Sequence, residues 1–79
     1  MDRNNPYRKS LVTLVKAINQ EIGLEEEDRV LLLMQLNTEE KIIQFFNWIK
    51  TKMEGEHLKA TAIEIMNASA MIDKGRPID

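Results

Sequence analysis

"QLNTEEKIIQFFNWIK", residues 35–50, joins a polar segment to a run of apolar and aromatic side chains. Asn37 and Glu40 have the spacing of a capping box, the reciprocal side-chain to backbone pairing that starts many helices, and Thr38 is an alternative cap. Beyond this start, apolar residues recur every three or four positions, which is the period of an amphipathic helix. We therefore predict a helix over 38–54. Its core stripe is Ile42, Phe45, Phe46, Ile49 and Met53, and Ile43 and Trp48 widen this stripe.

Three further helices are predicted over 6–22, 25–36 and 61–74. Asn5 and Pro6 provide a cap and a first-turn proline, and Gly23 is a usual helix stop. Residues 25–28 are all acidic, which favours a helix start because the N-terminus of a helix carries partial positive charge. Thr61 and Glu64 form a second capping box. The inner faces of the first and last helices are predicted to be Tyr7, Leu11, Leu14, Val15, Ile18 and Ile22, and Leu58, Ala62, Ile65, Met66, Ser69 and Ile72.

These signals predict an all-α fold, a compact bundle of four short helices in a single domain over 1–79. A chain of 79 residues holds one domain, and its content of 43% hydrophobic and 30% charged residues suits a folded core rather than disorder. Residues 56–60 are expected to form a loop, and the ends near 1–4 and 75–79 to fray. One uninterrupted helix over 25–54 is the rival interpretation.

The composition also bears on location and partners. The chain has no cysteine, so disulfides and thiolate metal sites are excluded, and stability must come from helix packing or from association with another chain. The longest uninterrupted apolar run is Val30–Met34, far below the roughly 20 residues that cross a bilayer. We expect a soluble cytoplasmic protein with no membrane partner.

Few residues could carry catalysis. His57 is the single histidine, and Glu54 and Glu56 are its nearest carboxylates in the sequence, a set short of the three oriented ligands of a catalytic zinc. Ser10 and Ser69 have no base nearby in sequence. Phosphate-binding glycine motifs and the spacing of a calcium-binding loop do not occur. We predict that the protein is not an enzyme, with no catalytic, cofactor or metal site and no small-molecule substrate.

The predicted helix 25–36 carries more apolar side chains than one core face needs. Two of them, Leu32 and Leu36, share a side with the polar residues Glu25, Asp28, Arg29 and Gln35, the side expected to face water. Excess apolar surface of this kind suits a contact with another chain. The candidate interface residues are Leu32, Leu36, Ile43 and Trp48. In the alternative, helix 25–36 is the centre of the bundle and Trp48 covers an edge of the core.

The function that these features predict is a noncatalytic helical protein-interaction or regulatory module that self-associates or binds a partner protein. Small, acidic, cysteine-free helical chains of this type are common among bacterial and phage accessory or regulatory proteins. The alternative is a small helix-turn-helix regulator that binds nucleic acid, because helices 25–36 and 38–54 joined by a tight turn have that outline. Against it, Glu39 and Glu40 lead the helix that would enter the groove, where Gln44, Asn47 and Lys50 are the best available readers.

We expect no specific binding to duplex DNA at physiological salt. The net charge of −2 and the two leading glutamates both repel phosphate. Electrophoretic mobility shifts at rising salt measure this, because nonspecific phosphate contacts weaken steeply as salt increases. A sequence-selective shift that survives the higher salt would contradict the prediction.

Overall fold

The computed structural model describes residues 5–78, and these residues form four helices with one small hairpin. The elements are α1 (Pro6–Ile22), α2 (Glu26–Gln35), α3 (Glu39–Thr51), β1 (Met53–Glu54), β2 (His57–Leu58) and α4 (Ala62–Asp73). The predicted all-α bundle of four helices is confirmed. Because α2 ends at Gln35 and α3 begins at Glu39, the rival single helix over 25–54 is wrong. Each helix in the described part of the chain is too short or too polar to cross a bilayer.

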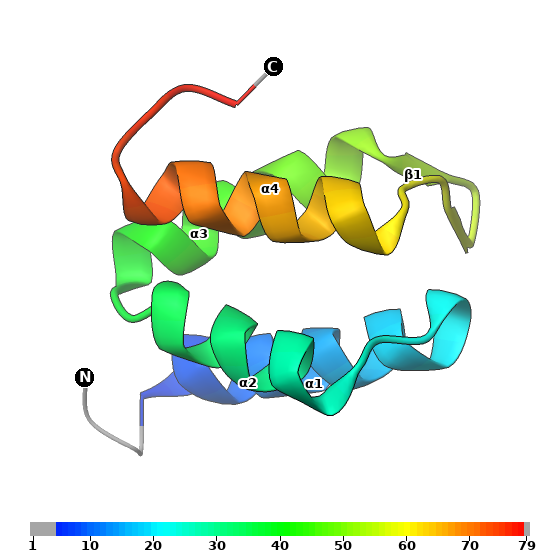
Figure 1. Ribbon diagram of the computed structural model, residues 1–79, viewed down its shortest axis with the longest axis horizontal. Helices are drawn as coiled ribbons and strands as arrows, with labels where there is room; N and C mark the ends of the chain where they lie inside the picture. Colours follow the sequence, from blue (N-terminus) through cyan, green and yellow to red (C-terminus); the bar gives the residue numbers. More distant parts are fainter. Residues whose placement is uncertain (1–4, 79) are drawn as a thin grey trace.

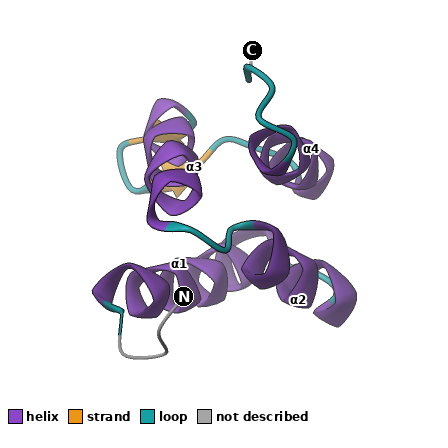
Figure 2. Ribbon diagram, turned by 90° about the vertical axis from the view of Figure 1, so that its left-hand side faces the viewer, coloured by secondary structure: helices purple, strands orange, loops and turns teal. Residues whose placement is uncertain are grey.

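The helices pack as two layers, with α1 beside α2 in one and α3 beside α4 in the other (Figures 1 and 2). Viewed from the end, α3 lies over α1 and α4 lies over α2 (Figure 2). The Asn5 side-chain amide donates to Glu39 Oε1 at 3.1 Å, which brings the starts of α1 and α3 together. Lys41 Nζ lies 3.1 Å from Asp73 Oδ1 and joins the start of α3 to the end of α4. Thus α1 and α3 run in the same general direction, whereas α4 runs opposite to α3.

Side-chain caps start three of the four helices. Asn5 Oδ1 accepts the backbone N–H of Tyr7 at 2.8 Å, as predicted. Thr38, rather than Asn37, caps α3 by accepting from the Lys41 N–H at 3.2 Å, which confirms the alternative cap. Thr61 and Glu64 form the complete capping box at the start of α4. At the start of α2 the Glu25 side chain makes no capping bond, and the acidic first turn stabilises the helix end by its charge alone.

The core lies between the two layers and takes side chains from all four helices. Phe45 is the largest fully buried side chain, and its ring centroid lies 6.1 Å from that of half-buried Trp48. Phe46 is half-buried at the core edge and Met53 is exposed, so the buried stripe of α3 is narrower than predicted. Most other residues predicted for the core are buried: Leu11, Val15, Ile18, Ile42, Ile49, Ile65, Ser69 and Ile72.

The segment after α3 differs from the prediction. Instead of continuing to residue 54, α3 ends at Thr51, and the chain folds back as an antiparallel hairpin that pairs Met53 with Leu58. Gly55 turns the hairpin with φ +63°, a conformation that glycine adopts without steric cost. The return places Leu58 half-buried against the core beside α1. Strands of two residues are too short to show alternation, which is why the sequence predicted only a loop.

The prediction of frayed ends falls partly on residues 1–4 and 79, which lie outside the described residues. Residues 75–78 follow α4 without helical structure. Ile78 is nevertheless half-buried against the core and lines a hollow with Trp48. Fraying of residues 75–78 stays a prediction, and the packing of Ile78 against the core opposes it.

Phe45→Ala should lower the free energy of unfolding by about 3 to 5 kcal/mol, because it leaves a cavity in the centre of the core. Phe46→Ala should cost less than about 2 kcal/mol, since a half-buried ring gives up only part of its transfer free energy. Urea denaturation followed by circular dichroism measures both. Equal losses for the two neighbouring phenylalanines would show that the core is placed wrongly.

Candidate functional site

The structure separates the four candidate interface residues. Leu32 and Leu36 are both 0% exposed, so the prediction that they face water is wrong, and neither is available to a partner of the folded chain. Ile43 is 39% exposed on α3, and Trp48 is half-buried on the same helix. A contact of Ile43 and Trp48 with another chain stays a prediction.

Two polar side chains explain why α2 turns its Leu32 side inward. Arg29 Nη1 donates to the carbonyl of Leu24, in the connection from α1 to α2, at 2.7 Å, and to Oδ1 of Asn19 on α1 at 3.2 Å. Gln35 Oε1 accepts from the hydroxyl of fully buried Ser69 on α4 at 2.6 Å. Burying a polar group costs little when it finds such partners, so the face that carries Arg29 and Gln35 can lie against the bundle.

The opposite side of α2 is apolar and exposed. Val30, Leu31 and Met34 are 49%, 42% and 65% exposed, and with Glu26 and Glu27 they line one shallow hollow. We call these five residues the α2 face. Surface helices normally turn such side chains inward, so three of them together on the outside make a candidate contact surface. Their exposure also shows that the alternative of a central α2 is wrong.

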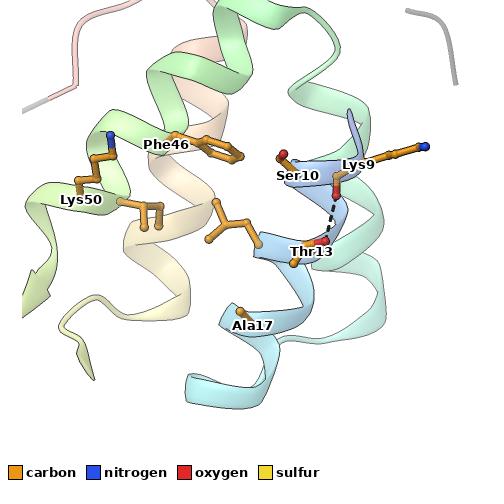
Figure 3. Close-up of a pocket in the computed structure, with 8 residues that line it drawn as sticks. Lys9, Ser10, Thr13, Ala17, Phe46 and Lys50 are labelled. Carbon is orange, nitrogen blue, oxygen red and sulfur yellow. Dashed lines mark hydrogen bonds between the residues drawn. The ribbon is translucent and has the colours of Figure 1, made fainter. Parts of the chain in front are cut away.

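A second apolar surface is an open groove of about 530 Å³ between α1 and α3 (Figure 3), here called the α1–α3 groove. Ser10 and Ala17 lie two turns apart on the same side of α1, and their small side chains leave the space open. Figure 3 shows the Phe46 ring reaching from α3 toward Ser10, while the Lys9 and Lys50 side chains extend outward from opposite sides of the groove. The lining residues are Lys9, Ser10, Thr13, Leu14 and Ala17 from α1, and Phe46, Ile49 and Lys50 from α3.

Polar groups are few along this groove, and those at its two ends differ in charge. The Thr13 hydroxyl donates to the Lys9 carbonyl at 3.1 Å, so its donor is satisfied within α1 (Figure 3). Toward the hairpin a second hollow continues from Leu14, Ala17 and Ile49 to two acidic side chains, Glu21 and Glu56. The groove therefore combines an apolar floor, two lysines at its rim and carboxylates at its hairpin end.

The chemically reactive side chains do not converge on either surface. His57 lies on β2, and its Nδ1 atom is 3.5 Å from Glu21 Oε1 of α1; the His57 side chain is 75% exposed and the Glu21 side chain 41%. Ser69 is buried and donates to Gln35, whereas Ser10 lines the groove without a histidine among its neighbours there. Within residues 5–78, no three metal-binding side chains lie together. What the two surfaces can do is contact apolar groups, and the absence of catalysis stays a prediction.

Comparisons with protein-family models, curated proteins and solved structures found no match to this chain. The α1–α3 groove and the α2 face are thus the features from which a function can be inferred. Sequence reasoning missed both. The small residues Ser10 and Ala17, seven positions apart on one side of α1, were the available signal for the groove.

Leu32→Glu should unfold the protein, whereas Met34→Glu, two residues later in the same helix, should leave it folded. The first substitution places a carboxylate without a partner in the core, and the second places it on a side chain that is already 65% exposed. Thermal melts followed by far-ultraviolet circular dichroism distinguish them. A cooperative melt of Leu32→Glu close to that of the wild type would contradict the burial of this leucine.

Proposed function

We propose that this protein is a noncatalytic helical interaction module and that its α1–α3 groove binds an apolar segment of another protein chain. The observation that carries the proposal is an apolar floor that the chain itself leaves open, formed by half-buried Leu14 and Phe46 above the edge of buried Ile49. Covering such a surface releases roughly 25 cal/mol for each Å² of apolar area removed from water. A groove without convergent catalytic groups is suited to this use.

The shape of the groove favours a helical ligand. Two helices that run side by side leave a channel into which a third can place side chains spaced three or four residues apart. Because Ser10 and Ala17 are small, the ligand backbone can approach α1 closely. Lys9 and Lys50 at the rim favour a segment whose apolar residues are flanked by carboxylates, since complementary charge speeds and orients association.

The alternative function, a nucleic-acid-binding regulator, receives less support. Three cationic side chains already have partners within the chain. Arg8 donates to the Leu33 carbonyl at 2.6 Å and Arg29 to the Leu24 carbonyl, and Lys41 pairs with Asp73 at the surface. Glu39 and Glu40 are exposed at the start of α3, the end that would approach phosphate. For the compartment we propose the reducing cytoplasm, which suits a chain without cysteine.

A photoreactive lysine analogue in place of Lys9 should give a discrete covalent adduct in host cells after illumination, because this side chain stands at the rim of the groove. The same analogue in place of exposed Lys74, at the end of α4, is the matched control. Adducts are resolved by denaturing gel electrophoresis and identified by mass spectrometry.

Two further variants of equal charge test whether the groove itself is responsible. Ala17→Glu puts a carboxylate in the groove and should remove the Lys9 adduct, whereas Gln20→Glu, exposed on α1 outside the groove, should retain it. Both residues are exposed, so both variants should keep the wild-type circular dichroism spectrum. The proposal fails if Lys9 and Lys74 give the same adducts, or if Ala17→Glu leaves the Lys9 adduct unchanged.

A further inference from the structure

The two apolar surfaces of this chain are complementary in charge. The α2 face carries Glu26 and Glu27 one turn before its exposed apolar residues, and the α1–α3 groove carries Lys9 and Lys50 beside its apolar floor. Neither glutamate takes part in an ion pair or a side-chain hydrogen bond among the described residues, and the same is true of the two lysine ammonium groups. The lysines of the groove thus offer the positive charge that the α2 face lacks.

We propose that the occupant of the α1–α3 groove is the α2 face of a second copy of this chain. The inference rests on the proposed function of the groove and names its ligand. In the complex, Val30, Leu31 and Met34 of one copy cover the apolar floor of the next, and Glu26 and Glu27 lie toward Lys9 and Lys50. Apolar burial supplies affinity, and the charges select the orientation.

The two surfaces also agree in length and pattern. From Glu26 to Met34, α2 rises about 12 Å, and from Lys9 to Ala17, α1 rises about the same 12 Å, at 1.5 Å per residue. Val30, Leu31 and Met34 are spaced as the anchors of a helix that lies in a groove, with Glu27 one turn earlier on the same side. A ligand helix of this length therefore spans the floor from the lysines toward the hairpin.

The two surfaces lie on different sides of the bundle, so the proposed contact joins different sites on the two copies. Helices α1 and α3 lie along one side of the bundle, and α2 lies on the other (Figure 2). A chain cannot place its own α2 face in its own groove, so each docked pair keeps one free groove and one free α2 face. Contacts of this type extend into rings or open filaments rather than stopping at a dimer.

A pairing of two α2 faces is the competing arrangement. It would cover the same three apolar side chains, but it would provide no cation for Glu26 and Glu27 and would leave the groove open. We call the proposed contact, between the α2 face of one copy and the groove of the next, head-to-tail. The two arrangements can be distinguished by mixing a variant whose groove is blocked with a variant whose α2 face is blocked. Only the head-to-tail contact can form between them, because it uses the intact surface of each variant.

Sedimentation velocity of such variants is the test. Wild-type protein should form species larger than a monomer at concentrations from micromolar to about 1 mM, whereas Ala17→Glu and Met34→Glu should each sediment as monomers, because a carboxylate then lies in the contact. Mixed in equal amounts, these two variants should form a complex of two chains that grows no further. Gln20→Glu and Ile63→Glu, the latter at a 74% exposed residue of α4, are the matched controls and should assemble like the wild type.

Charge reversal tests the predicted pairing directly. Glu26→Lys with Glu27→Lys, or Lys9→Glu with Lys50→Glu, should each weaken assembly by at least roughly tenfold, since like charges then face each other. All four substitutions in one chain should restore it. Failure of the fourfold variant to recover, while both double variants are folded and monomeric, would overturn the assigned pairing.

Other outcomes separate this inference from the proposed function. Wild-type protein that stays monomeric to about 1 mM, with a Lys9 adduct to a different host protein, overturns self-association and leaves the groove as a binding site for that protein. A Lys9 adduct with the mass of two chains supports the inference. Blocked variants that stay monomeric on mixing overturn the head-to-tail contact. Assembly that is lost in Met34→Glu but kept in Ala17→Glu also overturns it and shows pairing of α2 faces instead.

Discussion

The orientation of α2 about its own axis is the constraint on which the rest of the molecule depends. Arg29 and Gln35 hold it, the first by donating to the Leu24 carbonyl and to Asn19, and the second by accepting from buried Ser69. A purely apolar helix surface could rotate with little change in energy, whereas hydrogen bonds of defined direction tolerate only one orientation. With that orientation set, Leu32 and Leu36 enter the core and three apolar side chains remain in solvent.

The exposed apolar residues of α2 carry a cost that a small domain has few means to offset. A chain of 79 residues buries a smaller share of its surface than a large one, and this one has no disulfide to stabilise it. An outward apolar surface also favours association of molecules in solution. Both effects make sense in a protein whose working state is a complex, because binding to the folded form adds to its stability by mass action.

The sequence predicted the four helices well because their start signals are local. Asn5, Thr61 and Glu64 form their caps within a few residues, so their spacing predicted them, and at α3 it narrowed the cap to Asn37 or Thr38, of which the structure uses Thr38. The wrong face of α2 came from treating every polar residue as a solvent-facing one. Arg29 and Gln35 find partners on α1, in the preceding connection and on α4, and these partners are known only once the helices are packed. The groove was likewise invisible, because it depends on which side of α1 meets α3.

Helix α2 depends on a group outside the helix for part of its stability, and this decides whether the segment can keep its helical structure by itself. Helices of 10 residues are marginal in isolation, and here no side chain caps the start while the Leu33 carbonyl, near the end, is bonded by Arg8 of α1. An excised peptide over 24–36 would therefore lose most of its helical order, and its apolar residues would no longer share a face. The recognition surface is a property of the folded domain, so it cannot be transferred to another protein as a linear motif.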